Sequence, residues 1–314
     1  MAEEIMFHQK LARHHLAPPL LFRFTNGHAY QFMEGEACSA SGITDPLIWR
    51  GVAKELARWH TLLPAPPTNS STMGPLHQEH NVWATARKWL EAATGSATEK
   101  EELRLDLDYL VDRVLGTDPP GQALVLGHGD LLPANVIVQQ VAQGESNGLT
   151  ASRIPPGIVK FIDYEHACFC PRAFDLANHF AEWAGFECDY TRLPTKATRR
   201  EFLREYLAAC NQARPDPGPA GVPSGDGAVG QEHFESELAR LEADVDSYRG
   251  FPGFYWGLCA LLQAHSATGT IEFDYAGYSE TRFAEFRAWR AEDDGSRVEA
   301  GLDMPLWEDR WARE

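Results

Sequence analysis

Two short segments of this sequence carry the residue types that phosphoryl transfer from a nucleotide requires. The segment HGDLLPAN places Asp130 five positions before Asn135. The segment FIDYE ends an apolar stretch with Asp163 and Glu165. A carboxylate can orient a substrate hydroxyl and accept its proton, and hard oxygen ligands hold Mg²⁺ against the phosphates. The pattern therefore predicts Asp130 as the catalytic base. It also predicts Asn135 and Asp163 as Mg²⁺ ligands, with Glu165 beside them.

Short apolar runs around these segments are expected to bring them together. Residues 123–126 have the pattern of a short buried strand that ends at the first segment. Residues 136–138 and 158–162 have the pattern of a hairpin, which would place Asn135 and Asp163 at neighbouring strand ends. The first motif alone is also compatible with a chance turn. The strand and acidic residues that follow it disfavour that alternative.

The rest of the chain has the pattern of a small β-containing start and a mainly helical body. A hairpin is predicted over 20–33, where Asn26 and Gly27 favour a two-residue turn. Asp45 and Pro46 predict a helix start, because a capping residue precedes a first-turn proline. Further helices are predicted over 6–15, 103–114, 202–210, 234–248, 254–267 and 274–289. Linker, loop or low-complexity insertions are predicted over 34–42, 64–75, 139–157 and 214–230.

The chain of 314 residues is strongly acidic, with a formal net charge of −17 and 44% hydrophobic residues. This charge argues against nucleic acid and anionic membrane as partners. An acidic cleft would raise the local concentration of a cationic substrate, although the same charge also serves solubility alone. The six cysteines show no disulfide or metal-binding spacing. Without a signal peptide at the first residues, or an apolar run of about 18 residues, we expect a cytoplasmic protein with reduced thiols.

Longer blocks of sequence extend the pattern beyond single motifs. They are HGDLLPANVI at 128–137, IDYE at 162–165 with RAFDLANHFAEWAG at 172–185 and DY at 189–190, and FYWGL at 254–258 with IEFDY at 271–275. On these blocks and the hairpin of the first 33 residues, the chain resembles the choline/ethanolamine kinase family, and ethanolamine kinases in particular. An aminoglycoside-phosphotransferase-like enzyme would share only the first motif and the IDxE step.

The resemblance implies an α+β, protein-kinase-like bilobal fold with a truncated N-lobe and a mainly helical C-lobe. Residues 1–36 would be the remnant of the N-lobe and the hinge. Residues 37–314 would be the C-lobe with the catalytic loop, the metal site and the amine pocket. Glu4 aligns with a helix glutamate that pairs with a strand lysine in the family, but that lysine and the Gly-rich phosphate loop are not in the sequence. We therefore expect weak activity of these residues alone, and self-association through the uncovered hairpin.

The resemblance also implies roles for residues outside the two motifs. The hinge, whose backbone groups would meet the adenine of ATP, consists of Gln31, Phe32 and Met33. The amine pocket is lined by Glu182, Tyr190 and Trp256. Aromatic faces and one carboxylate suit an ammonium group. Without the resemblance, Glu182 would be interpreted as a surface residue and Trp256 as a core residue.

One residue departs from the family pattern in the amine pocket. The family has a second tryptophan three positions after Trp256, where this chain has Cys259. The loss of one aromatic wall favours a smaller ammonium group over choline.

The implied function is Mg²⁺- and ATP-dependent phosphorylation of ethanolamine, with choline as a second acceptor, at the first step of the CDP-ethanolamine route to phosphatidylethanolamine. The partners are then an amino alcohol and ATP, with no nucleic acid and no membrane insertion, and a homodimer stays open. Two alternatives remain. One is an inactive truncated paralogue or isoform that binds a full-length kinase, and the other is an incomplete gene model of a normal enzyme.

Overall fold

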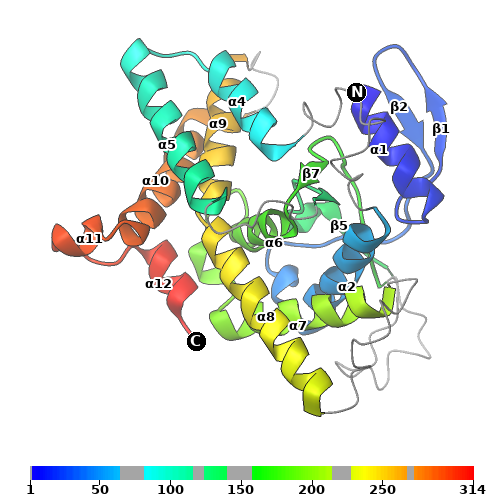
Figure 1. The fold of residues 1–314 in the computed structure, drawn as a ribbon. Helices are drawn as coiled ribbons and strands as arrows, with labels where there is room; N and C mark the ends of the chain where they lie inside the picture. Colours follow the sequence, from blue (N-terminus) through cyan, green and yellow to red (C-terminus); the bar gives the residue numbers. More distant parts are fainter. Residues whose placement is uncertain (1, 64–80, 116–123, 140–157, 214–227, 267–271) are drawn as a thin grey trace, which may run out of the picture. The chain divides into compact units, whose positions relative to one another are not determined.

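The computed structural model describes residues 2–63, 81–115, 124–139, 158–213, 228–266 and 272–314 (Figure 1). Its contacts divide the chain into two compact units. Unit 1 consists of Met1–Ala65, Val125–Ala167 and Lys196–Ala243, and unit 2 consists of Pro66–Leu124, Cys168–Thr195 and Asp244–Glu314. The predicted division at residue 36 is a functional one and stays a prediction.

Unit 1 combines short strands with long helices. Its elements are α1 (Ala2–Arg13), β1 (Leu20–Arg23), β2 (His28–Tyr30), β3 (Glu36–Ala37), η1 (Gly42–Thr44), α2 (Pro46–Leu62), β4 (Val125–Gly127), η2 (Pro133–Asn135), β5 (Val136–Val138), β6 (Val159–Phe161), α7 (Lys196–Ala213) and most of α8 (Ala228–Tyr248). The buried strand predicted over 123–126 is β4, and the helix predicted around 202–210 is the middle of α7.

A three-stranded antiparallel sheet in the order β3-β5-β6 supports the predicted magnesium ligands. Val136 pairs with Phe161 and Val138 with Val159, so the predicted hairpin is confirmed. Most of the predicted insertion between its strands, 140–157, lies outside the described residues. The linker predicted over 34–42 was wrong in part, because Glu36 and Ala37 form a strand that pairs with β5. Two residues are too few to show an alternating pattern in the sequence.

The first hairpin, β1 and β2, is antiparallel as predicted. Its turn is closed by the Phe24 N–H, which donates to the Gly27 carbonyl over 2.8 Å. The second strand ends at Tyr30, before the predicted hinge residues. Four large apolar side chains are more than half exposed on this hairpin and the segment after it: Leu21, Phe22, Phe24 and Phe32.

Helix α2 is the platform of unit 1 and begins where the sequence predicts. The Asp45 side chain accepts a hydrogen bond from the Leu47 N–H over 2.8 Å, and Pro46 is the first helical residue. The helix packs against α7, where His60 Nδ1 lies 2.8 Å from the Tyr206 hydroxyl. His60 is buried there as a packing residue.

Unit 2 is mainly helical. Its elements are α4 (Val82–Ala92), α5 (Ala97–Leu115), β7 (Cys168–Cys170), α6 (Arg172–Ala181), η4 (Glu182–Ala184), η5 (Tyr190–Arg192), the end of α8, α9 (Phe251–Ser266), α10 (Tyr275–Asp293), α11 (Ser296–Glu299) and α12 (Leu306–Ala312). The helices predicted over 103–114, 254–267 and 274–289 are α5, α9 and α10.

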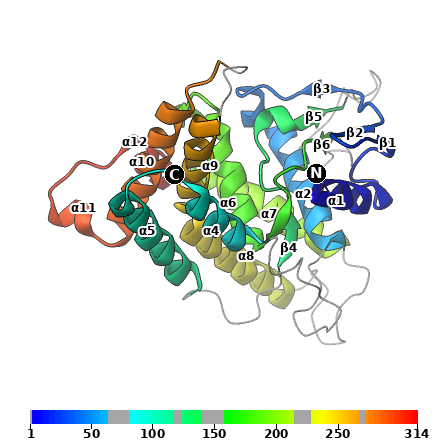
Figure 2. The same ribbon diagram turned by 90° about the horizontal axis from the view of Figure 1, so that it is seen from above.

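Helices α9 and α10 lie side by side (Figure 2). Glycines allow this close approach, because a Cβ at Gly253 would lie 2.8 Å from the Arg282 carbonyl oxygen, and one at Gly257 would lie 2.9 Å from the Phe283 ring. Arg282 is therefore buried within unit 2 instead of lying on its surface. Among the described residues, no helix is both long enough and apolar enough to cross a membrane.

Candidate active site

The predicted catalytic base, Asp130, lies in a loop that His128 ties to the end of β6. The Asp130 N–H donates to His128 Nδ1 over 3.3 Å. The proton of this imidazole must then be on Nε2, which donates to the Ile162 carbonyl over 3.0 Å. His128 is fully buried, and its ring packs against Trp59 with centroids 5.4 Å apart. His128 is therefore a structural residue of the loop, and the partly exposed Asp130 carboxylate is the group that can meet a substrate.

Asn135 connects the Asp130 loop to the strand that carries Asp163. Its Nδ2 donates to the Asp130 carbonyl over 2.8 Å and lies 3.3 Å from Asp130 Oδ2. Its own carbonyl accepts the N–H of Ile162 over 3.0 Å. Because the amide nitrogen is used by Asp130, the side-chain oxygen Oδ1 is the Asn135 atom that suits a cation.

Asp163 and Glu165 follow β6 on the exposed side of the same hairpin. Asp163 has φ +66°, a left-handed conformation that is uncommon for a residue with a Cβ and is concentrated at functional sites. Loss of hydration, followed by the charge of Asp163, raises the pKa of the Glu165 carboxyl. The two carboxylates therefore repel each other, and a bound cation would relieve that repulsion.

The residues of this hairpin fit magnesium. Mg²⁺ takes oxygen donors, usually one or two carboxylates, and completes its shell with water and phosphate. The Asn135 amide oxygen and the Asp163 carboxylate provide such donors, and Glu165 adds a second carboxylate nearby. The predicted metal residues thus belong to one hairpin, and their role as ligands stays a prediction.

Gly129 lets the catalytic loop approach the chain after Glu165. It has φ +77°, and a Cβ there would lie 2.2 Å from the His166 carbonyl oxygen. We predict that Gly129→Ala lowers the free energy of unfolding by at least about 3 kcal/mol, because backbone strain and a backbone clash add. The matched control is Gly295→Ala, since Gly295 has φ +79° but nothing within 4 Å of a Cβ. That variant should lose only about 1 kcal/mol. Equal losses in urea denaturation would show that the close approach is absent.

The predicted hinge residues Gln31, Phe32 and Met33 lie in the segment between β2 and β3. The Gln31 N–H donates to the Pro19 carbonyl over 2.9 Å, so this amide is already used within the protein. The Phe32 side chain is 75% exposed. If this segment meets adenine, the backbone groups of Phe32 and Met33 are the better candidates.

Glu4, the residue aligned with the family's helix glutamate, contacts a histidine. Its Oε1 lies 3.6 Å from Nε2 of His28 on β2. The charge of Glu4 also contributes to the raised pKa of Glu165. His28 was not predicted to take part here. It is the first residue of β2, and no pattern in the sequence marks it.

In unit 2, Glu182 is buried beside a cation that the sequence interpretation did not predict. Its Oε1 lies 3.3 Å from Nη2 of Arg282, and Nε of Arg282 lies 3.2 Å from Oε2 of Glu285. Arg282 is 0% exposed, and both glutamates are at most 4% exposed. A buried guanidinium requires such partners, because its desolvation without them would be prohibitive. The cluster holds two carboxylates and one guanidinium.

Tyr190, the second predicted amine-pocket residue, belongs to this cluster. Its hydroxyl donates to Glu285 Oε1 over 2.9 Å. Burial raises the pKa of Glu285 to about 7, although the Arg282 charge partly opposes the rise. Burial also raises the pKa of Glu182, which the charge of Arg282 opposes, so both carboxyl groups of the cluster bind a proton more readily than an exposed glutamate does.

Trp256, the third predicted amine-pocket residue, is 9% exposed on α9. Its indole N–H donates to Asn178 Oδ1 over 2.8 Å, which fixes the ring. Cys259 lies one turn further along the same helix and is half-buried. No other signal in the sequence marks Arg282 or Glu285, because their partner Glu182 lies about a hundred positions away.

A catalytic loop held to an antiparallel hairpin, with a carboxylate after the second strand, is typical of protein-kinase-like folds. A sequence model of the choline/ethanolamine kinase family matches residues 1–287. Ethanolamine kinase 2 of Rattus norvegicus is 31% identical over 287 residues, covering 90% of this chain and 64% of the relative. Ethanolamine kinase 1 of Homo sapiens is 30% identical over 302 residues, covering 90% and 57%. The chain thus spans less than two thirds of the length of these relatives, and it belongs to the choline/ethanolamine kinase family.

Solved structures confirm the predicted α+β, protein-kinase-like fold. An ethanolamine kinase of Plasmodium vivax superposes with a TM-score of 0.65 at 24% identity, covering 91% of this chain and 72% of the other. A choline kinase of Cryptosporidium parvum gives a TM-score of 0.68 at 17% identity, covering 96% and 80%.

Proposed function

We propose that this chain phosphorylates ethanolamine with ATP. The hydroxyl oxygen of the amino alcohol forms a bond to the γ-phosphorus while the bond from that phosphorus to the β,γ-bridging oxygen breaks. ADP leaves, and the hydroxyl proton passes to the Asp130 carboxylate. The product would enter the CDP-ethanolamine route to phosphatidylethanolamine, and the site of action would be the cytoplasm.

The observation that carries the proposal is the hydrogen bonding around Asn135. The Asn135 side chain donates to the carbonyl of Asp130, and the Asn135 carbonyl accepts the N–H of Ile162, the residue before Asp163. These bonds support the proposal, because they link the residue proposed as proton acceptor to the segment of the proposed cation ligands within unit 1. The Asn135 side chain also lies 3.3 Å from Asp130 Oδ2, so it helps to hold the carboxylate that would accept the hydroxyl proton. Such positioning supplies much of the rate enhancement in phosphoryl transfer.

Magnesium, when bound, would neutralise the charge that develops on the phosphate oxygens. Two residues of this chain are held in place for binding the ion. Asn135 is fixed through its amide nitrogen, and Asp163 is held in a left-handed conformation that a free chain avoids. Both are therefore oriented before a nucleotide arrives.

The buried cluster around Arg282 in unit 2 supports the proposal that the substrate phosphorylated by ATP carries an ammonium group. Two carboxyl groups flank the single guanidinium of Arg282, so the cluster has one acidic group more than it has basic groups, and a primary ammonium can pair with it. Tyr190 and Trp256 are each held by a hydrogen bond, so their aromatic surfaces are ordered. An excess of acidic groups and ordered aromatic rings suit an amino alcohol better than a neutral sugar.

We predict a preference for ethanolamine over choline, because Cys259 supplies no aromatic face to a quaternary ammonium. Cys259→Trp should shift the ratio of kcat/KM values toward choline by between about 2-fold and 30-fold, since one cation–π contact contributes about 0.5–2 kcal/mol. Competition between the two amines at limiting ATP measures the ratio. A parent protein that already prefers choline would contradict the assignment.

A second candidate function is a non-catalytic partner of a full-length kinase. The observation that favours it is the apolar exposure of Leu21, Phe22 and Phe32 around the first hairpin. Exposed apolar side chains beside a strand edge are typical of surfaces that bind another chain. Light scattering and a kinase assay on the same purified sample separate the two functions.

A further inference from the structure

The C-terminal helix α12 lies beyond residue 287, where the match to the family ends, yet it is packed into unit 2. Its two tryptophans, Trp307 and Trp311, are 2% and 4% exposed. They stand four positions apart on one face of the helix, and their rings stack with centroids 6.3 Å apart. A helix of seven residues does not form by itself, so α12 depends on these contacts.

Trp307 packs directly on the segment that carries two of the predicted amine-pocket residues, Glu182 and Tyr190. It forms a buried cluster with Ala181, Ala184 and Leu193, and Tyr190 packs against that cluster. The rings of Tyr190 and Trp307 meet edge to face, with centroids 5.5 Å apart and an interplanar angle of 83°. The Trp307 indole thus packs against both ends of the segment 182–192.

A hydrogen bond adds to this packing. Arg310, on the same helix, donates from Nε to the Leu193 carbonyl over 3.0 Å. The carbonyl lies directly after η5, the short helix that begins with Tyr190. Helix α12 therefore holds η5 by both an aromatic contact and a main-chain bond.

Tyr190 transmits this constraint to the buried charges. Its hydroxyl donates to Glu285, Glu285 contacts Arg282, and Arg282 contacts Glu182. A shift of the Tyr190 ring would remove one of the hydrogen-bond donors of the buried Glu285 carboxylate. The cluster would then have to rearrange, because unpaired buried charges are costly.

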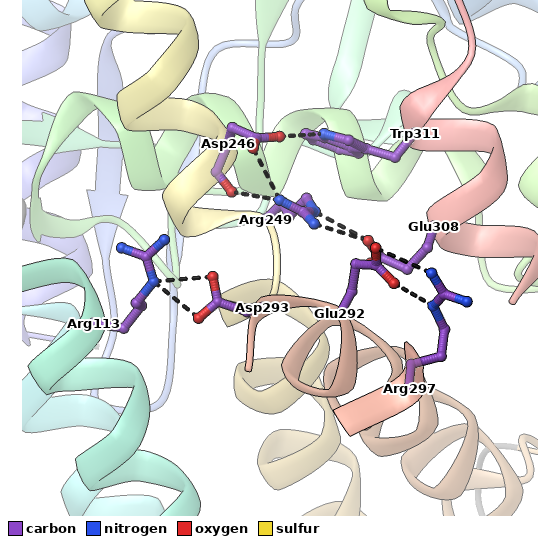
Figure 3. Close-up of polar contacts among 8 residues, drawn as sticks. All are labelled: Arg113, Asp246, Arg249, Glu292, Asp293, Arg297, Glu308 and Trp311. Carbon is purple, nitrogen blue, oxygen red and sulfur yellow. Dashed lines mark hydrogen bonds and ion pairs between the residues drawn. The ribbon is translucent and has the colours of Figure 1, made fainter. Parts of the chain in front are cut away.

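Helix α12 is itself fixed at the junction of α8 and α9, as Figure 3 shows. Arg249 Nη2 lies 2.9 Å from Glu308 Oε2, and Arg249 Nη1 lies 3.0 Å from Asp246 Oδ2. The Trp311 indole N–H donates to Asp246 Oδ1 over 2.7 Å. Nearby, Arg297 of α11 pairs with Glu292 of α10. These bonds anchor α12 through Glu308 and Trp311, in addition to the contacts of Trp307.

We propose that α12 is a positioning element for the amine site: Trp307 holds Tyr190, and through it the Glu285–Arg282–Glu182 cluster, in the arrangement that binds an ammonium substrate. The proposal rests on the proposed function for the identity of that substrate. Trp307 does not touch the substrate. Its effect is on affinity for the amine and leaves the affinity for ATP unchanged.

The unpaired indole of Trp307 provides a conservative variant. Its N–H is buried without a hydrogen-bond partner among the described residues. Trp307→Phe keeps an aromatic ring against Tyr190 and removes that donor, so KM for ethanolamine should stay within about 2-fold of the parent. Trp307→Ala removes the edge-to-face contact and should raise that KM by about 3- to 10-fold, with KM for ATP unchanged. Leu306→Ala is the matched control, because Leu306 lies on α12 and is 54% exposed.

Amide hydrogen exchange without substrates tests the positioning independently of the reaction. Exchange of amides 182–193 should accelerate in Trp307→Ala and remain at the parent rate in the phenylalanine and Leu306→Ala variants. Arg310→Gln removes only the bond to Leu193 and should give a smaller acceleration in the same segment. It is the variant to use if Trp307→Ala does not fold. Unchanged exchange at 182–193, or acceleration spread evenly over unit 2, would overturn the proposal. Local acceleration in a protein whose parent does not phosphorylate ethanolamine would support the positioning role and refute the proposed substrate.

Discussion

Replacement of Asp130 by asparagine is expected to lower kcat by at least about 100-fold, the loss that follows removal of a general base. The variant retains an oxygen that can accept the hydrogen bond from Asn135 Nδ2, and the bond to the Asp130 carbonyl is untouched. The loop should therefore keep its shape while it loses the proton acceptor. Initial rates at saturating ATP and ethanolamine measure the effect.

Thermal unfolding is the control for Asp130→Asn, and the melting temperature should stay within a few degrees of the parent. A second control is His128→Gln, which perturbs the support of the loop and not the base. This variant should lose stability as well as turnover. An Asp130→Asn protein that is folded and keeps most of its kcat would remove Asp130 from the catalytic role.

The second large effect is expected at the predicted metal site. Asp163→Ala should abolish Mg²⁺-dependent binding of ATP, because it removes the carboxylate predicted to hold the ion together with the neutral oxygen of Asn135. The substitution also replaces the residue with φ +66° by one without a polar side chain, so a small loss of stability is expected. Calorimetric titration of Mg·ATP into the protein measures the affinity directly.

A matched control for Asp163→Ala is Glu299→Ala, which removes one exposed carboxylate from α11. It changes the net charge equally and should leave the affinity for Mg·ATP unaltered. Glu165→Ala should fall between the two, since Glu165 is predicted to lie near a second ion. If Asp163→Ala binds Mg·ATP as the parent does, the ligands must be sought elsewhere.

The local parts of the fold were predictable from the sequence because their signals are local. Asp45 before Pro46 fixed the start of α2, and Asn26-Gly27 marked the first hairpin. The β5–β6 hairpin was also predictable, although 20 residues separate its strands, because both strands are short apolar runs with breaks on each side.

The buried charges of unit 2 were not predictable in the same way. Arg282 lies on a helix whose sequence shows charges on several faces, and nothing local separates a buried arginine from an exposed one. Its burial depends on Glu182, which comes from another part of the chain. Tertiary partners of this kind override the usual preference of arginine for the surface.

Helix α12 was missed for a different reason. Seven residues are too few for a convincing helical period, and their only signal is the pair Trp307 and Trp311. That pair is spaced for one helical face, which could have indicated a docked helix. Its contact with Tyr190 could not have been inferred without the structure.

The most direct test of the central claim is the product formed from ethanolamine. The chain is incubated with Mg·ATP and ethanolamine, and ³¹P NMR follows phosphoethanolamine and ADP in the same sample, with Asp130→Asn as the background. The proposed function predicts the two products in equal amounts, formed at a rate well above that of the variant. ADP without phosphoethanolamine, or equal rates in the parent and Asp130→Asn, would contradict it.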